Sequence, residues 1–198
     1  MPKNVEIERR FLVDGRQKRP WIAESPDKIH ITQWYLEADL FTASEATCSL
    51  SYDNIVMVAD VESALCQTIN QNPNWTVRVR NWNNTYFLTL KGARKGATAI
   101  EYEWELAADV ATSIVQDSHH PHIEKNRYLW HGADGMLWEI DEFEGNLAGL
   151  IIAEVELETE ASEILLPEWV GMELTHLKGW SNALLVRMTH QELSLIHI

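Results

Sequence analysis

The chain has 198 residues, with 16 Lys and Arg against 30 Asp and Glu, so its formal net charge is −14, and 45% of its residues are hydrophobic. That length and composition are typical of one globular domain that buries a core. An acidic chain lacks the surplus of Lys and Arg that neutralises phosphates, which argues against non-specific binding to nucleic acid or to an anionic membrane surface.

The sequence contains no run of the roughly 18 apolar residues that a membrane span requires, and its first residues do not resemble a signal peptide. Its two cysteines, Cys48 and Cys66, match neither a disulfide framework nor a CxxC metal site, and free thiols fit a reducing compartment. We therefore expect a cytoplasmic protein with no membrane partner.

Alternation of apolar and polar residues predicts eight strands. They span residues 4–13, 28–37, 74–82, 84–92, 99–107, 123–132, 136–144 and 149–158. Turn residues at Asn83-Asn84, 132–135 and 145–149 predict hairpins, so neighbouring strands are expected to be antiparallel. Helices are expected at 107–117, as a turn or two at 160–166, and at 181–193, where Ser181 can cap the first turn. The predicted fold class is mainly β (α+β): an eight-stranded antiparallel β-barrel with a few flanking helices.

Residues 37–74 interrupt this pattern. They contain no Lys or Arg, their alternation is weak, and they are too few to form a core of their own. We interpret them as an insertion loop within a single domain of residues 1–190. Residues 191–198 lack a cap or stop signal and are expected to be a disordered tail.

The predicted strands carry charged residues at alternate positions, so each set shares one face of its strand. These rows are Glu6, Glu8 and Arg10; Arg78 and Arg80; Glu101, Glu103 and Glu105; Lys125 and Arg127; Glu139 and Asp141; Glu154, Glu156 and Glu158. A face turned to water is the ordinary interpretation of one such strand. However, solvated faces usually mix residue types, whereas these rows each carry almost one sign of charge.

The alternative is that these faces point into the barrel, where eight strands leave room for side chains or one small ligand. Converging carboxylates then require cations, and oxygen donors without His or Cys favour Mg²⁺ or Mn²⁺. The Arg and Lys rows, with Lys91, require an anion that suits guanidinium forks, such as phosphate. The apolar outer face would be covered by the helices at 107–117 and 181–193 and by tryptophans. This pattern indicates a site for a metal-bound polyphosphate, with solvated faces of an ordinary barrel as the other interpretation.

The segment Glu6-Ile7-Glu8-Arg9-Arg10 resembles the ExExK signature that opens CYTH domains, the triphosphate tunnel metalloenzymes. Further similar blocks follow in order at 31–36, 76–80, 87–92, 101–105, 123–128, 138–143, 153–157, 169–175 and 181–185. The chain is most similar to the short bacterial members of this family.

This resemblance implies a metal-dependent inorganic triphosphatase that hydrolyses tripolyphosphate inside a tunnel, with nucleoside triphosphates such as ATP as further candidate substrates. The implied metal ligands for Mg²⁺ or Mn²⁺ are Glu6, Glu8, Glu103, Asp141, Glu154 and Glu156, with Glu105 as an alternative to Glu103. The implied substrate-binding residues are Arg10, Arg78, Arg80, Lys91, Lys125 and Arg127. Arg10, Tyr35 and Lys91 are the implied catalytic residues. The expected partner is a small-molecule triphosphate, and the expected state is a monomer or homodimer.

Three departures from the family pattern stand out, and the first is that residues 37–74 are much longer than the short connection expected. Arg10 occupies the position of the signature Lys, and an Arg cannot readily lose a proton. The Arg that often precedes the Glu-Tyr-Glu block is absent, and Arg94 or Lys95 could replace it. A non-catalytic polyphosphate-binding module is kept as an alternative because the two arginine departures could disable catalysis. A class IV-type adenylate cyclase is kept as another alternative because both reactions need the same charged clamp. Thiamine triphosphate as substrate would require an aromatic shelf, for which Trp34 and Trp82 are candidates.

Overall fold

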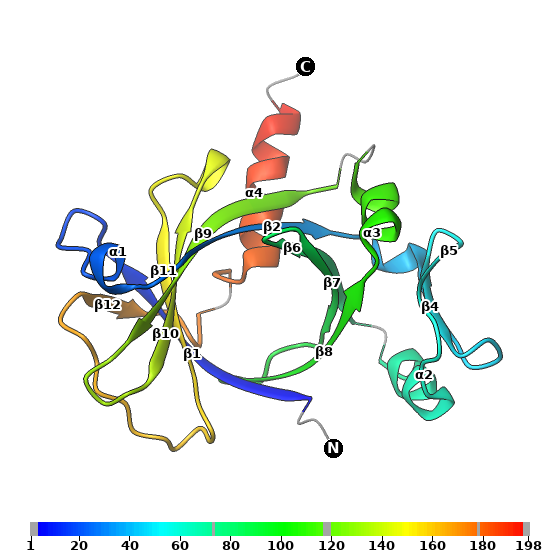
Figure 1. Cartoon of the computed structure of the whole chain (residues 1–198), viewed down its shortest axis with the longest axis horizontal. Coiled ribbons are helices and arrows are strands. Elements are labelled where there is room, and N and C mark those ends of the chain that lie inside the picture. The colour runs from blue at the N-terminus through cyan, green and yellow to red at the C-terminus, as the bar shows by residue number, and fades with distance from the viewer. Residues whose placement is uncertain (1–3, 73, 117–119, 178, 196–198) are drawn as a thin grey trace. The chain divides into compact units, whose positions relative to one another are not determined.

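The computed structural model describes residues 4–72, 74–116, 120–177 and 179–195. Its elements in chain order (Figure 1) are β1 (Val5–Val13), α1 (Trp21–Glu24), β2 (Lys28–Tyr35), the 3₁₀ helix η1 (Ala38–Leu40), β3 (Phe41–Ser44), β4 (Ser49–Tyr52), β5 (Ile55–Val58), α2 (Ser63–Asn70), β6 (Thr76–Trp82), β7 (Thr85–Lys91), β8 (Thr98–Leu106), α3 (Ala108–Val115), β9 (His122–His131), β10 (Leu137–Phe143), the 3₁₀ helix η2 (Gly145–Leu147), β11 (Ile151–Glu156), β12 (Val170–Glu173) and α4 (Asn182–Leu195). Within these described ranges, no helix is both long and apolar enough to cross a membrane.

The predicted strands are all present, as β1, β2 and β6–β11, and each end lies within two residues of the expected position. The large sheet has the order β11-β10-β9-β2-β6-β7-β8-β1-β12, and a further pairing between β11 and β1 closes it. The fold is therefore an eight-stranded antiparallel barrel, as predicted, with β12 as an additional strand that the sequence did not reveal.

The hairpin turns explain why the strands pair in this register. Asn83 (φ 48°) and Asn84 (φ 68°) both have left-handed backbone conformations, as a two-residue type I′ turn requires. This turn pairs Trp82 with Thr85 and therefore Arg78 with Thr89. Because side chains alternate between faces, Arg78 opposite Thr89 and Arg80 opposite Phe87 lie on the same face of the β6–β7 hairpin.

The chain divides into two compact units, residues 1–31, 94–99 and 123–198, and residues 32–93 and 100–122. In the first unit, the apolar face of β1, β10 and β11 packs against Trp21 and Trp169, whose rings lie 4.9 Å apart. Trp21 is fully buried and belongs to α1, a helix that the sequence did not predict. Trp169 also has the rings of Trp130 and Trp138 as neighbours, so four tryptophans pack together in this core.

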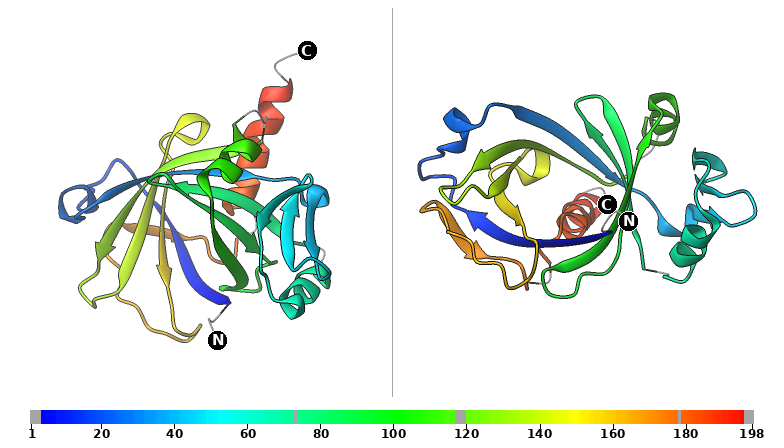
Figure 2. Two further views of the ribbon diagram at one scale, coloured as in Figure 1. Left: turned by 45° about the vertical axis from the view of Figure 1, so that its right-hand side comes forward. Right: turned by 60° about the horizontal axis from the view of Figure 1, so that its bottom comes forward.

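In the second unit, α3 and the 37–74 segment cover the apolar face of β6, β7 and β8. The prediction of a loop at 37–74 is wrong, because β3, β4 and β5 form a three-stranded antiparallel sheet and α2 lies beside it (Figure 2). Leu50 and Cys66 from this segment are fully buried in the same core as Val79 and Leu88. The apolar outer face of β6–β8 thus supplies the core that the segment is too short to form alone.

The C-terminal region partly follows the prediction. Ser181 Oγ accepts a hydrogen bond from the Leu184 backbone N–H at 3.3 Å, which is the expected cap of α4. Residues 160–166 contain a turn at 160–161 and no helix. α4 extends to Leu195 and so includes part of the expected tail, whereas residues 196–198 lie outside the described residues.

Candidate active site

In the first unit, the face of β1, β9, β10 and β11 opposite the apolar core carries a charged cluster, which we call the β1–β11 cluster. Its members are Glu8, Arg10, Lys125, Arg127, Glu139, Asp141 and Glu154, joined by ion pairs. Lys125 and Asp141 are each only 1% exposed. The charged residues on this face are therefore buried and paired with one another, and they do not form a row of solvated side chains.

Asp141 is the centre of this cluster. One of its carboxylate oxygens accepts from Arg127 Nε at 2.7 Å, and the other accepts from Arg127 Nη2 at 2.7 Å and from Lys125 Nζ. Arg127 also donates to Glu139 and, at 3.2 Å, to Glu154. Because both oxygens of Asp141 are engaged by buried cations, the carboxylate serves in this structure to hold Lys125 and Arg127 and not to face a metal ion.

These contacts determine the pKa values in the cluster. Burial, and next the neighbouring Arg127, lower the pKa of Lys125 to about 8, although Asp141 and Glu154 oppose the shift. Burial also favours the neutral form of Arg127, but Asp141 and Glu139 outweigh it, and the pKa of Arg127 lies well above its ordinary value. Burial raises the pKa of Glu139, against the opposing effect of Arg127. Lys125 is therefore the cation in this cluster whose charge changes at mildly alkaline pH.

We expect the free energy of unfolding to rise between about pH 8 and pH 10.5. In this window Lys125 is largely deprotonated in the folded state but still protonated in the unfolded chain, so the unfolded state binds more protons and stability increases with pH. The pKa of Lys125 differs by about 2.5 between the unfolded and folded states, which corresponds to about 3 kcal/mol in the free energy of unfolding. Urea unfolding from pH 7.5 to 10.5 measures this rise, which should be absent in Lys125→Met. Identical pH profiles for the two proteins would contradict the assignment.

Arg10 binds the C-terminal region. Its guanidinium donates to Glu154 Oε1 at 2.7 Å, to the Trp180 carbonyl at 2.8 Å and to Asn182 Oδ1 at 3.3 Å. The start of α4 therefore lies on the charged side of β1, and not over the apolar outer face as expected from the sequence. A Lys with one ammonium group could not hold these three acceptors in the same planar arrangement. The structure explains Arg10 as a residue that ties β1 to β11 and to α4, a role that motif comparison did not suggest.

Glu6 and Glu8 lie two residues apart on β1, beside Arg94. From the sequence, Arg94 is only a candidate to replace the missing arginine of the family pattern. Arg94 Nη2 donates to Glu8 and lies 3.8 Å from Glu6. Glu8 also lies directly opposite Glu156 in the register of β1 and β11. Two carboxylates that lie directly opposite each other on paired strands repel each other unless a cation lies between or beside them. Glu156 is exposed, which leaves it open to a ligand.

The donor chemistry of this end of the cluster fits a divalent cation. Glu6, Glu8 and Glu156 offer only carboxylate oxygens, which hard cations such as Mg²⁺ prefer. Across the described residues, however, no three His, Cys, Asp or Glu side chains converge closely enough to hold a metal ion in their present positions. A metal ion held by these carboxylates would require their side chains to rotate and Arg94 to leave Glu8. Asp141 and Glu154 are bound to Arg and Lys, so they fit a supporting role better than direct ligation.

The second unit has its own charged face on β6, β7 and β8, which we call the β6–β8 cluster. Arg78 and Lys91 both bind Glu101, each at 3.0 Å. Arg80 binds Glu103, which also accepts from Thr89 Oγ1 at 3.1 Å. Burial opposes ionisation of Glu101, but Arg78 and Lys91 outweigh it and lower its pKa.

The β6–β8 cluster thus brings together four of the predicted site residues, Arg78, Arg80, Lys91 and Glu103. Each cation is held by a carboxylate of β8, so Glu103 acts in this structure as an ion-pair partner of Arg80. Tyr35 also belongs to the second unit, at the end of β2, where its backbone N–H donates to the Pro121 carbonyl at 2.9 Å.

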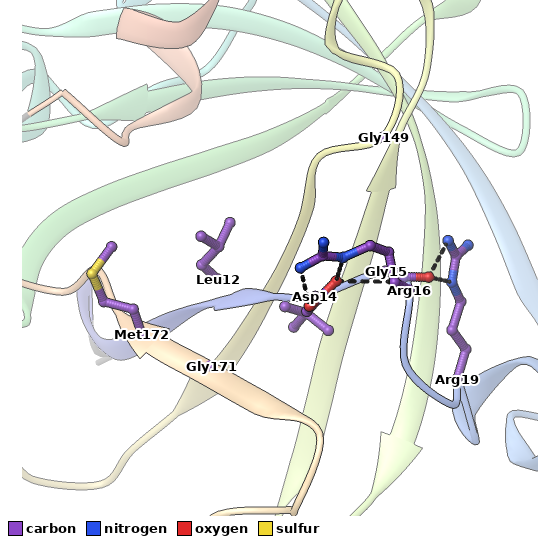
Figure 3. Close-up of a pocket in the computed structure, with 9 residues that line it drawn as sticks. Leu12, Asp14, Gly15, Arg16, Arg19, Gly149, Gly171 and Met172 are labelled. Atoms are coloured by element: carbon purple, nitrogen blue, oxygen red, sulfur yellow. Dashed lines mark hydrogen bonds and ion pairs between the residues drawn. The ribbon is translucent and has the colours of Figure 1, made fainter.

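A separate cavity of about 650 Å³ lies at the end of β1 in the first unit. It is lined by Leu12, Val13, Asp14, Gly15, Arg16, Arg19, Gly149, Gly171 and Met172 (Figure 3). Arg16 is paired with Asp14, and Arg19 donates to the Gly15 carbonyl. None of the charged residues predicted for the site lines this cavity, which therefore does not coincide with either cluster.

The fold and these clusters define a class of protein: an antiparallel β-barrel whose strands carry rows of paired charges. Residues 69–183 match the CYTH domain model. An inorganic triphosphatase of Acetivibrio thermocellus is 40% identical over 113 residues, which are 57% of this chain and 72% of that protein. An inorganic triphosphatase of Nitrosomonas europaea is 33% identical over 108 residues, which are 54% of this chain and 71% of that protein. The crystal structure of the inorganic triphosphatase NE1496 matches 91% of this chain and 93% of its own, with a TM-score of 0.55 and 26% identity.

The chain therefore belongs to the CYTH domain family. The matched residues contain most of both clusters but not β1. The assignment of Glu6, Glu8 and Arg10 depends instead on their signature-like spacing and on their contacts in the structure.

Proposed function

We propose that this protein is an inorganic triphosphatase that requires a divalent metal ion. The observation that carries the proposal is the 40% identity to an inorganic triphosphatase over 72% of that relative. The two clusters support it chemically, because they supply carboxylates for a hard cation and arginines for phosphate oxygens. The cytoplasmic location and the monomeric or homodimeric state stay predictions from the sequence.

For the metal, we assign Glu6, Glu8 and Glu156 as the ligands, with Mg²⁺ or Mn²⁺ as the ion. When bound, such an ion neutralises phosphate charge and orients the attacking water. Glu154 accepts from both Arg10 and Arg127, and in this proposal it orients those cations beside the ligands.

For the triphosphate, we assign Arg78, Arg80 and Lys91 as the binding residues. Guanidinium forks match pairs of phosphate oxygens, and Lys91 adds a movable point charge. Glu101 and Glu103 hold these cations in place before the substrate arrives. Because Lys125 and Arg127 are buried against Asp141, they act as positioning residues in this proposal and not as direct phosphate contacts.

The reaction transfers a terminal phosphoryl group to water. The water oxygen forms a new bond to the terminal phosphorus as the bond to the bridging oxygen breaks, which yields orthophosphate and pyrophosphate. Negative charge that develops on the leaving oxygen is stabilised by the arginines and Lys91. Tyr35 keeps the role that the family resemblance implies, as a residue beside the attacking water.

One assay panel tests this proposal. Purified protein is incubated with Mg²⁺ or Mn²⁺ from pH 7 to pH 10, and phosphate is measured with tripolyphosphate as substrate, while phosphate and cyclic AMP are measured with ATP. We expect phosphate release from tripolyphosphate that stops with a chelator and returns when metal is added in excess. Cyclic AMP with pyrophosphate would instead establish a cyclase, and inactivity on both substrates would favour a binding module.

A further inference from the structure

Arg94 lies in the short connection between β7 and β8, and its guanidinium reaches back to β1. Its Nη2 donates to the Glu8 carboxylate and lies 3.8 Å from Glu6 Oε2. Its Nη1 donates to the Ala97 carbonyl at 3.1 Å and to the Glu8 carbonyl at 3.4 Å. One guanidinium thus lies at both carboxylates of β1 that we assign to the metal and is also bound to the backbone beside them.

The backbone of this connection holds Arg94 against β1. The Glu8 backbone N–H donates to the Ala97 carbonyl at 3.1 Å. Lys95 and Thr98 each donate a backbone N–H to the other's carbonyl, at 2.8 and 3.1 Å, and so close a tight turn. This turn belongs to the same compact unit as β1. The position of Arg94 is therefore built into the fold of that unit.

The surrounding charges explain why a cation is held at this point. Glu8 is buried and lies opposite Glu156 in the register of β1 and β11, and a buried carboxylate is costly without a nearby cation. Arg10 Nε lies 4.0 Å from Glu8 and is hydrogen-bonded to Glu154. Arg94 makes the closer contact with Glu8. It occupies carboxylate oxygens that a divalent ion would also bind, so the arginine and the ion compete for them.

We propose that Arg94 is a resident counter-ion of the metal site, which holds the Glu6 and Glu8 carboxylates and releases them when a divalent ion binds. This inference rests on the metal assignment in the proposed function and adds a control of metal affinity to it. An ion binds only where its attraction to the carboxylates exceeds that of Arg94. The wild type therefore binds metal less tightly than the carboxylates alone would, and the charge of Glu8 stays balanced where metal is scarce.

Calorimetry with Mn²⁺ alone tests this competition, because it requires neither substrate nor turnover. Arg94→Gln removes the charge but keeps an amide that can donate to the Ala97 carbonyl. We expect this variant to bind Mn²⁺ about tenfold more tightly than the wild type, the size of effect typical of losing one hydrogen bond between charged groups. Tighter binding should also give a larger rise in melting temperature when Mn²⁺ is added.

Lys95→Gln is the matched control, because it removes the same charge from the same turn and the Lys95 side chain is exposed. Its affinity for Mn²⁺ should equal that of the wild type. Equal or weaker Mn²⁺ binding by Arg94→Gln, an equal gain in Lys95→Gln, or no Mn²⁺ binding by either the wild type or Arg94→Gln would overturn the counter-ion.

A measurement on the wild type covers the case in which Arg94→Gln does not fold. The side-chain N–H signals of Arg94 in nuclear magnetic resonance spectra, assigned by comparison with Arg94→Lys, should shift when Mg²⁺ is added. Unchanged signals at saturating Mg²⁺ would contradict the proposal. If Arg94→Gln binds Mn²⁺ more tightly but the wild type does not hydrolyse tripolyphosphate, the counter-ion stands and the proposed function fails. Hydrolysis by the wild type with equal Mn²⁺ affinities gives the reverse result.

Discussion

Replacing Glu8 by Gln is expected to reduce phosphate release from tripolyphosphate by roughly a thousandfold at fixed metal concentration, which corresponds to about 4 kcal/mol of lost transition-state stabilisation. Glu8 faces Glu156 across β1 and β11 and is the more buried of the two signature carboxylates on β1. The substitution keeps the volume of the side chain but removes a negative charge that we assign to the metal. Glu156→Gln should have an effect of the same order.

Thermal melts and a matched substitution separate this effect from misfolding. Glu163→Gln makes the same chemical change at an exposed residue outside both clusters and should leave turnover unchanged. Glu8→Gln should melt close to the wild type, because Arg94 and Arg10 retain other carboxylate neighbours. Wild-type turnover of Glu8→Gln at every metal concentration would exclude Glu8 as a ligand.

The largest expected effect on stability comes from Asp141. Asp141→Asn removes the only negative charge that binds both Lys125 and Arg127 among the contacts described above, and leaves two cations buried beside each other. Breaking a buried ion pair from one side typically costs about 3–5 kcal/mol. For a chain of this length we expect the melting temperature to fall by roughly 10 °C.

The chain offers a control with the same chemistry at the surface. Asp14 also binds an arginine, but its partner Arg16 is 91% exposed, and exposed pairs contribute little to stability. Asp14→Asn should therefore leave the melting temperature unchanged in differential scanning calorimetry. Equal, small shifts for the two variants would show that the buried network does not depend on the charge of Asp141.

The charged rows on the strands have a double role. In the β6–β8 cluster the same cations that we assign to the triphosphate are held by Glu101 and Glu103. Such pairing lowers the cost of burying arginine, which is high for an unpaired charge. A polyphosphate that enters the cluster would replace one set of anionic partners by another, so a stable empty site and a binding site are compatible.

Several features could be predicted from the sequence because they are local. Alternating polarity over a few residues identified the barrel strands, and Asn83-Asn84 identified a hairpin. A second signal of this kind, Asp53-Asn54, forms the turn between β4 and β5 with positive φ at both residues, and it could have revealed the small sheet within 37–74. The weak alternation of this segment arises because its strands are only four residues long.

A strand alternates its side chains with a period of two, so the sequence was enough to locate the barrel strands, the residues that share a face of each strand, and the rows of charge on those faces. Only the tertiary structure decided how those charges pair. Arg10 binds Glu154 and Asn182 across long stretches of chain, and the 37–74 segment folds because the outer face of other strands completes its core. Burial and pairing depend on residues that are distant in the chain, and no local pattern encodes those partners.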